Sequence, residues 1–304
     1  MLTYDVWGIR RSGNHAIIGW LLNHVGTPFI HFNDIQDPWN PLTPGGVKVA
    51  GVPAWQYKRG LLRKARQFFR SRHEATFAGS DPSVDYERLA TLSGLACRVF
   101  SYEDKLVTSS SEALGAAMPG ETRKSVLLLR DPFNLFASLL KAGYFSRPLD
   151  ELPGIYARHA EEFMRQHETD IIGVNYNEWF QDADYRVSTA RKLGFDTDGT
   201  PYDDVPPNGG GSSFSGRARR GQASKMNVLH RWRHFAEHAE FARLVSEPRV
   251  REAAEALFPE LADEVYRTLR PAASGSTRSS GSAASASASF ASTSMRNHNA
   301  CRKL

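Results

Sequence analysis

The chain has 304 residues, of which 41% are hydrophobic, enough to build one large domain. It contains no run of 18 apolar residues, and its two cysteines, Cys97 and Cys301, are too few for a disulfide framework or a cysteine zinc site, so we expect a protein of the reducing cytoplasm without a transmembrane segment. The net charge is +5, but four of the basic residues lie beyond residue 270 with no acidic residue among them, so the remainder is nearly neutral and nucleic acid is not indicated as a partner.

Short apolar segments alternate with amphipathic ones along most of the chain. We predict strands at 4–9, 28–32, 98–102, 125–129 and 171–174. We predict helices at 14–25, 133–143, 155–167, 185–193 and 224–244, and two short ones near Glu252 and Asp263. This alternation is typical of a parallel sheet with helices on both faces. The sequence therefore predicts one α/β domain over residues 1–270, with ligands bound at the carboxyl ends of the strands.

Three segments depart from the alternation. Residues 34–53 are rich in Pro and Gly, which indicates a long loop. Residues 57–72 carry apolar side chains on one side and seven Lys or Arg on the other. They are predicted to form a helix that either packs on the core or makes peripheral contact with an acidic or lipid-linked acceptor. Residues 271–304 are rich in Ser, Ala and Gly and are predicted to be a disordered tail.

The segment WGIRRSGNHAII, at residues 7–18, joins the first predicted strand to the first predicted helix. A turn between a strand and a helix points backbone N–H groups at a bound phosphate. Gly8 and Gly13 are separated by four residues, as in a Walker A loop, but Asn14 and His15 stand where an ATPase needs Lys and then Ser or Thr. The loop therefore indicates a phosphate ligand, without the usual metal.

A second basic motif follows the strand predicted at 125–129. Asp131 is placed to cap the next helix, and Pro132 suits its first turn. Arg130 at the end of the strand and Ser138 on the helix can converge on one anion, because the guanidinium supplies a charged fork and the serine a hydroxyl donor.

In this order, the two motifs resemble those of the PAPS-dependent sulfotransferase family, whose fold is related to that of P-loop kinases. The resemblance covers residues 2–233. It implies a P-loop NTPase-like architecture and transfer of a sulfuryl group from PAPS (3′-phosphoadenosine 5′-phosphosulfate) to an acceptor hydroxyl or amine, with release of PAP and without a metal. It also implies that Arg130 and Ser138 bind the 3′-phosphate, and that a loop of six residues binds the 5′-phosphosulfate: Arg11, Ser12, Gly13, Asn14, His15 and Ala16.

The resemblance extends to three further positions. Tyr176 stands where family members often place a tyrosine near the adenine. The stretch Ser212-Ser213-Phe214 resembles one that approaches the purine. The stretch Arg219-Arg220-Gly221 resembles the C-terminal cofactor loop, although its spacing from Phe214 is shorter than in cytosolic members and Arg217 competes for the phosphate role.

Sulfuryl transfer needs a cation at the leaving group and a base for the acceptor's proton. Arg11 is the candidate cation, and His15 either donates to the sulfonate or caps and packs the helix. Glu103 follows the strand at 98–102, at a place similar to that of the catalytic histidine of cytosolic members, and is the first candidate for the base. The alternatives are His31 and Asp34 as the base, and an ion pair of Glu103 with Lys105 or with an arginine of the cofactor loops.

His230, His234 and His238 recur every four residues in the helix predicted at 224–244. No fourth ligand is evident, so a solvated helix face is favoured over a metal site, with Trp232 and Phe235 on the buried side.

Two other functions stay open: an ATP-dependent P-loop phosphotransferase, and a non-catalytic domain that binds a nucleotide or glycan. The acceptor (a glycan, a lipid or a small molecule) and the oligomeric state cannot be read from the sequence.

Overall fold

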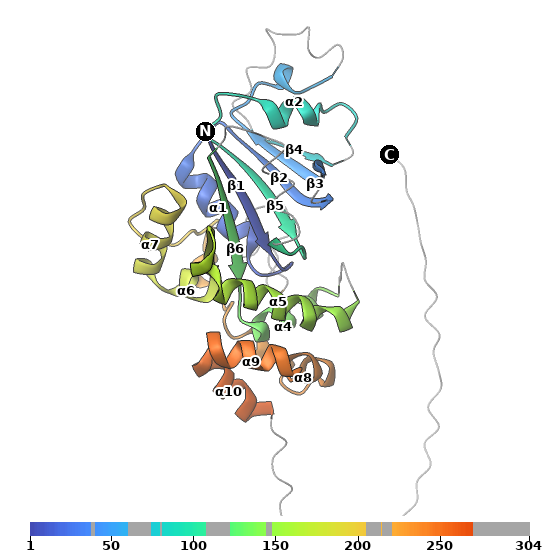
Figure 1. The fold of residues 1–304 in the computed structure, drawn as a ribbon, viewed down its shortest axis with the longest axis vertical. Helices are drawn as coiled ribbons and strands as arrows, with labels where there is room; N and C mark the ends of the chain where they lie inside the picture. Colours follow the sequence, from blue (N-terminus) through green and yellow to red (C-terminus); the bar gives the residue numbers. More distant parts are fainter. Residues whose placement is uncertain are drawn as a thin grey trace, which may run out of the picture. The chain divides into compact units, whose positions relative to one another are not determined.

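The computed structural model of the chain describes residues 1–37, 40–59, 74–79, 81–107, 122–143, 148–204, 214 and 221–269, without the side chain of residue 41. Residues Met1–Leu269 form one compact unit. A central, mostly parallel sheet lies between two sets of helices (Figure 1). The α/β class predicted from the sequence is therefore confirmed.

The described residues form a sheet of seven strands in the order β4-β3-β2-β5-β1-β6-β7. The strands are β1 (Leu2–Gly8), β2 (Phe29–Asp37), β3 (Asn40–Ala50), β4 (Ala75–Ala78), β5 (Cys97–Glu103), β6 (Thr122–Leu129) and β7 (Ile171–Asn175). Neighbours among β2, β5, β1, β6 and β7 pair in parallel, and β3 and β4 are antiparallel to the strands beside them. All five strands predicted from the sequence are present.

The prediction of a long loop at 34–53 is wrong. β2 continues to Asp37, and β3 returns beside it with Phe29 opposite Ala50 and Ile35 opposite Pro44. The prolines and glycines misled the prediction because they disrupt a central strand but are tolerated near the edge of an antiparallel sheet, where fewer ladder hydrogen bonds are needed. Val47 and Val49, which are buried, supply the alternating apolar positions.

Helices connect the strands at the expected places. The helices are α1 (Asn14–Val25), α2 (Tyr86–Thr91), α4 (Pro132–Ala142), α5 (Leu152–Met164), α6 (Tyr176–Gln181), α7 (Ala183–Leu193), α8 (Ala239–Val245), α9 (Pro248–Leu257) and α10 (Pro259–Leu269). The helices predicted at 14–25, 133–143, 155–167 and 185–193 and near Glu252 and Asp263 correspond to α1, α4, α5, α7, α9 and α10. As predicted, the side chain of Asp131 caps α4 by accepting from the Asn134 amide, and Pro132 lies in its first turn.

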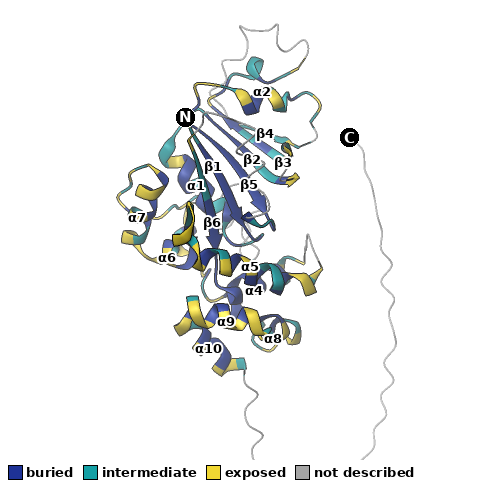
Figure 2. Ribbon diagram, in the orientation of Figure 1, coloured by how far each residue is buried: buried dark blue, intermediate teal, exposed yellow. Residues whose placement is uncertain are grey.

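Two apolar cores lie against the two faces of the sheet. Because side chains alternate along a strand, Val6 faces the core beneath α1, α6 and α7, whereas its neighbour Trp7 faces the core beneath α4, α5, α8, α9 and α10. The central strands β1 and β5 are buried almost throughout, whereas β3 and β4 near one edge of the sheet and the outer helix faces are partly exposed (Figure 2). A sheet covered on both faces leaves its carboxyl edge as the place where polar groups can gather.

The prediction of one long helix at 224–244 is also wrong. This segment forms two 3-10 turns, Ala223–Lys225 and Arg231–Phe235, and only then the short α8. The side chain of Asn134 on α4 accepts hydrogen bonds from the amides of Arg231 and Trp232, which ties the backbone to α4 instead of to its own helix. The three histidines therefore do not share a helix: His230 precedes the second turn, and His238 caps α8.

Most of the helix predicted at 57–72 lies outside the described residues, as does the predicted tail at 271–304. The first three residues of that predicted helix, 57–59, are described and are not helical; Lys58 forms an isolated β-bridge with Val84. No helix in the described part of the chain is long and apolar enough to span a membrane.

The strand order places the two basic motifs at a switch point of the sheet. From β1 the chain crosses to strands on one side, and from β6 it crosses to β7 on the other. β1 and β6 are neighbours, with Gly8 opposite Leu128. In open α/β sheets, ligands bind in the crevice beyond the carboxyl ends of such a pair of strands. The loop after β1 and Arg130 after β6 border that crevice.

Candidate functional site

The loop between β1 and α1 has the features of an anion-binding site. Gly13 adopts a left-handed conformation (φ 99°) and caps α1 without a side-chain hydrogen bond, and the first turn of α1 contains no acidic residue. Within the described residues, the amides of Gly13, Asn14 and His15 donate no hydrogen bond to the protein. Three amides without partners at the positive end of a helix form a binding place for a phosphate or sulfate group.

Tyr176, the first residue of α6, packs directly on this loop. A Cβ atom placed on Gly13 would lie 2.2 Å from Cε2 of the Tyr176 ring. Only glycine fits both this approach and the positive φ. The structure therefore brings Tyr176, predicted from the sequence to lie near the adenine, against the phosphate loop.

Arg130 connects the two motifs. Its guanidinium is buried and donates from Nη1 to the carbonyl of Arg11 (3.1 Å) and from Nη2 to the carbonyl of Val228. The guanidinium carbon lies 5.1 Å from the centre of the Tyr176 ring. Arg130 makes no ion pair with a carboxylate of the described residues, and its buried Nε has no hydrogen-bond partner there. A buried cation without a counter-ion is costly, so this geometry favours an anionic ligand.

Ser138 lies beside Arg130, as the sequence predicts. Its buried Oγ is 3.5 Å from Nη1 of Arg130 and donates to the Asn134 carbonyl (2.6 Å). Ser138 also accepts a hydrogen bond of 3.0 Å from Nη1 of Arg231. One hydroxyl is thus shared by two buried arginines.

Sequence reasoning missed Arg231, which lies in the segment predicted to form the helix at 224–244. Only 8% of its surface is exposed, and burial, followed by the charge of Arg130, lowers the pKa of its guanidinium to about 9. The guanidinium stays protonated at neutral pH, so the site holds two close positive charges. The Phe214 ring, predicted to approach the purine, lies 5.1 Å from the guanidinium carbon of Arg231. No local pattern marks this arginine, because the hydrogen bonds from Asn134 bring it here.

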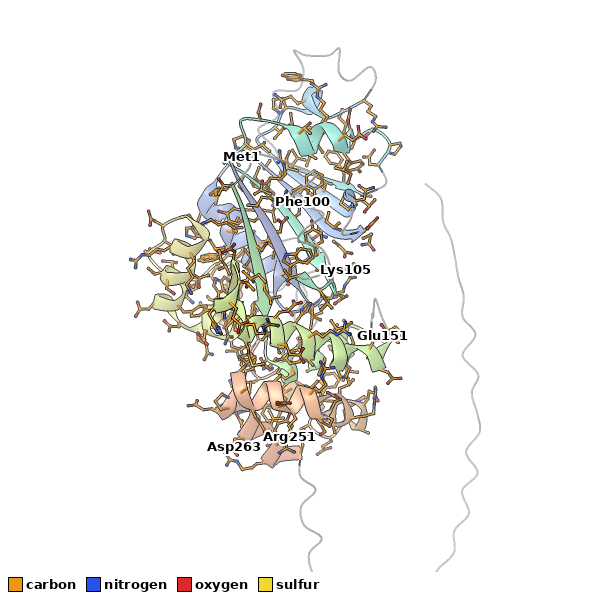
Figure 3. The ribbon with its side chains drawn as sticks, viewed as in Figure 1. Met1, Phe100, Lys105, Glu151, Arg251 and Asp263 are labelled. Carbon is orange, nitrogen blue, oxygen red and sulfur yellow. The ribbon has the colours of Figure 1, made fainter. Side chains whose placement is uncertain are left out.

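A second group of charged residues lies at the carboxyl ends of β2 and β5. Asp34, Glu103 and Asp104 surround the Arg10 side chain, with N···O distances of 3.0, 3.0 and 3.6 Å. The ion pair foreseen for Glu103 is therefore formed with Arg10 of the phosphate loop. In Figure 3, the labels of Phe100 within β5 and of Lys105 beyond it show the direction of the strand, whose last residue is Glu103.

Glu103 faces the phosphate loop. Its Oε1 lies 3.4 Å from Nδ2 of Asn14 and 3.9 Å from Nε2 of His15. Burial raises the pKa of the Glu103 carboxyl to about 7, against the opposing effect of Arg10. A carboxyl that titrates near neutral pH beside an anion-binding loop can take up or release a proton there.

The two candidate histidines are neutral at pH 7. Burial, together with Arg11, lowers the pKa of His15 to about 4. Burial, together with His15, lowers the pKa of His31 to about 3. Nε2 of His31 lies 3.0 Å from Oγ of Ser101, deep in the sheet. Asp34, with a fifth of its side chain exposed, is nearer to solvent than Glu103.

The other predicted residues are placed as follows. Ser12 is buried, and its amide closes the loop on the Ile9 carbonyl, while the amide of Ala16 bonds to the Gly13 carbonyl. Gly221 lies in an exposed turn. Ser212, Ser213, Arg217, Arg219 and Arg220 lie outside the described residues. In the part of the chain that the structure describes, no cluster of His, Cys, Asp and Glu is arranged to hold a metal ion.

A cavity of about 600 Å³ lies elsewhere, at the amino end of β7. Phe163 and Met164 of α5, Ile171 of β7 and Leu257 of α9 contribute to its lining. It contains none of the residues predicted to be functional, so the candidate site is defined by the charged groups at the opposite edge of the sheet.

No family model, curated protein or solved structure matches this chain. The site is therefore described from its geometry alone. It combines uncapped helix amides, a pair of buried arginines on one serine, and a carboxyl of raised pKa, all at the carboxyl ends of β1, β5 and β6. Such a site suits a ligand with two separate anionic groups and a reaction that moves a proton.

Proposed function

We propose that this protein is a PAPS-dependent sulfotransferase, which moves a sulfuryl group to an acceptor hydroxyl or amine and releases PAP. The observation that carries the proposal is Arg130: a buried guanidinium with an unpartnered Nε, hydrogen-bonded to both the phosphate loop and Ser138. It joins two anion sites, and PAPS is a nucleotide with anionic groups at both its 5′ and 3′ positions.

The residues present fit PAPS. Arg11 and the amides of Gly13, Asn14 and His15 would hold the 5′-phosphosulfate. Arg130 and Ser138, with Arg231 as an added cation, would hold the 3′-phosphate. Aromatic rings stand beside both groups, since Tyr176 covers Gly13 and Phe214 lies against Arg231. Either ring offers a face on which a purine can stack.

When bound, PAPS supplies a sulfuryl group activated by its bond to a phosphate. The acceptor oxygen or nitrogen attacks the sulfur in line, so that one bond to sulfur forms while the bond to the phosphate oxygen breaks. Arg11 and the uncapped amides of α1 stabilise the negative charge that develops on the leaving phosphate. Glu103 accepts the proton that the acceptor loses.

Glu103 suits this role because of its position and its pKa. Its Oε1 is directed at the phosphate loop, and a pKa of about 7 leaves a large share of the carboxyl ionised at neutral pH. A base whose pKa lies near the working pH is efficient, because it is both available and strong enough. His15, neutral at this pH, can donate a hydrogen bond to the sulfonate.

Thermal stabilisation by nucleotides tests the proposal. At saturating concentration, PAP should raise the melting temperature by several degrees, and more than 5′-AMP, ADP or ATP, because only PAP also occupies Arg130 and Ser138. ATP with Mg²⁺ tests for a phosphotransferase instead. No preference for PAP, or a preference for ATP with Mg²⁺, contradicts the proposal.

A further inference from the structure

Arg10 is in contact with three carboxyl groups at the carboxyl edge of the sheet, those of Asp34, Glu103 and Asp104. Its Nε lies 3.0 Å from Oε2 of Glu103, and its Nη2 lies 3.0 Å from Oδ2 of Asp34. Its amide donates to Oδ1 of Asp104 (2.9 Å), whose own amide donates to the Gly8 carbonyl (3.1 Å). One residue thus ties together the ends of β1, β2 and β5.

The backbone around Arg10 is held in an unfavourable conformation. Asp34 and Asp104 have positive φ values of 53° and 58°, as does Arg11 with 71°. Residues other than glycine adopt this region only where surrounding contacts hold them, and they gather at functional sites. The contacts that hold Asp34 and Asp104 here include those to Arg10.

The two oxygens of Glu103 have different surroundings. Oε2 is held by Arg10, while Oε1 lies near Nδ2 of Asn14 and Nε2 of His15. Asn14 and His15 belong to the phosphate loop. Because Arg10 holds Oε2, Oε1 is the oxygen that faces the loop.

We propose that Arg10 is a positioning residue, which holds Oε2 of Glu103 so that Oε1 faces the phosphate loop as the proton acceptor. This inference rests on the proposed function for the identity of the reaction, but the contacts that carry it do not depend on the substrate. The side chain of Arg10 is paired with Asp34, Glu103 and Asp104, so the proposal gives it a role different from that of Arg11.

The surrounding charges determine what removal of Arg10 does. Asp34 and Asp104 both raise the pKa of Glu103, Arg10 and the hydrogen bond from Asn14 lower it, and His15 is neutral near pH 7. Without Arg10, three carboxyl groups face one another without their shared cation. The pKa of Glu103 should then rise above about 7, and Oε1 should lose its fixed orientation.

The test compares Arg10→Met and Arg10→Lys with the unmodified protein and with Arg165→Met as control. Arg165 pairs with Glu168 on the exposed surface, 3 residues away. The titration of Glu103 is followed by ¹³C NMR of labelled carboxyl groups, with Glu103→Gln identifying its signal. PAP-induced stabilisation is measured in parallel.

We expect Arg10→Met to raise the pH of half-titration of Glu103 by about one unit or more, Arg10→Lys to raise it less, and Arg165→Met to leave it unchanged. PAP should still stabilise both Arg10 variants. With an acceptor in hand, the activity lost in Arg10→Met should return in part at higher pH and in part in Arg10→Lys.

An unchanged titration of Glu103 in the Arg10 variants overturns the inference, and so does loss of PAP binding, which would make Arg10 a nucleotide ligand. Should Arg10→Met not fold, Arg10→Lys supplies the same two readouts. Failure of the proposed function is a different result: PAP would then not be preferred over ADP by the unmodified protein, whatever the titration of Glu103.

Discussion

At the scale of single residues, the site depends on charged groups that are kept from water. Glu103 is the clearest case, because burial raises the pKa of its carboxyl to about 7 even with Arg10 at 3.0 Å. Arg130 is the opposite case, a buried cation whose Nε finds no partner in the described residues. Burial is incompletely compensated at both groups among the described residues, and an anionic ligand at Arg130 or a proton at Glu103 would compensate it.

Replacing Glu103 tests its role as the base. In Glu103→Gln, turnover should fall by about 10²–10⁴-fold, because the amide cannot accept the acceptor's proton, while the affinity for PAP should stay the same. In the unmodified enzyme, kcat/KM should fall as the pH drops below about 7, where Glu103 becomes protonated. Near-normal turnover in Glu103→Gln would shift the assignment to Asp34 or His31.

The raised pKa of Glu103 also predicts how stability depends on pH. The folded protein binds this proton more tightly than the unfolded chain, so the contribution is complete below about pH 4.5 and is lost as the pH rises to about 7. The amide in Glu103→Gln does not titrate, so this variant does not lose stability between these pH values. The difference in free energy of unfolding between Glu103→Gln and the unmodified protein should therefore change by a few kcal/mol in favour of the variant as the pH rises from about 4.5 to about 7.

Denaturant unfolding at a series of pH values measures this difference. His15 and His31 contribute a slope of the opposite sign, because burial lowers their pKa values, but both proteins contain them. Parallel stability curves for the two proteins would mean that Glu103 titrates as an ordinary surface carboxyl.

Ser138 offers a mild probe of the second anion site. Ser138→Ala removes the hydroxyl shared by Arg130 and Arg231, so the affinity for PAP should fall about tenfold while that for ADP changes little. Ser188→Ala is the matched control, since Ser188 also bonds to the carbonyl of its preceding helical turn but is exposed. Calorimetric titration of each variant with PAP and with ADP measures these affinities. Equal losses of affinity for PAP and ADP would place the 3′-phosphate elsewhere.

At the scale of elements, the proposed function depends on the connection between β1 and α1. The helix begins without a side-chain cap, so its first amides are left for a ligand. α4 is built differently. Asp131 caps it, so its amino end is satisfied by the protein and the ligand groups come from Arg130 and Ser138 instead. The two neighbouring connections would therefore hold the anionic groups of the proposed ligand by different means.

Gly13→Ala tests the geometry of the phosphate loop. The positive φ alone should cost about 1–2 kcal/mol, and the new Cβ would overlap the Tyr176 ring. Gly143→Ala is the control, because Gly143 is also left-handed (φ 62°) but no atom lies within 4 Å of the added Cβ. Gly13→Ala should lower the melting temperature more than the control does and abolish stabilisation by PAP. Equal effects of the two variants would mean that Tyr176 does not press on the loop.

At the scale of the whole molecule, the sheet brings together connections that are far apart in the sequence. β1 and β6 are neighbours although about 120 residues separate them, so the phosphate loop and Arg130 border the same crevice. The C-terminal helices close the face of the sheet that carries α4. Tyr266 of α10 packs on Phe133 at the start of α4 and donates to the Val245 carbonyl.

Truncation tests which part of the chain the fold requires. A chain ending at Leu269 should unfold at the same temperature as the full chain and bind PAP equally well, because Met1–Leu269 form a compact unit. A chain ending at Phe258 loses α10 and its buried Ala262, Val265 and Tyr266, and should be destabilised by about 3 kcal/mol or more. Circular dichroism melts compare the three chains. A lower melting temperature for the chain ending at Leu269 would assign a structural role to residues 270–304.

Much of the framework could be predicted from local patterns. The apolar runs predicted all five parallel strands, the Asp131-Pro132 pair predicted the start of α4, and the glycines of the first loop predicted its turn. The failures, at 34–53 and 224–244, have a common cause. In both segments long-range contacts, to β2 and to Asn134, outweighed what the local composition favoured.

The sequence by itself determined the strand-loop-helix of the proposed phosphate site and the pairing of Arg130 with Ser138, because each depends on residues close together in the chain. Only the tertiary structure decided that Arg231 joins Ser138 across 93 residues and that Arg10 binds Glu103 across a similar distance. Such contacts depend on which strands lie side by side, and no local periodicity encodes that. The sulfuryl chemistry proposed for the opening loop thus relies on partners that the loop's own residues do not reveal.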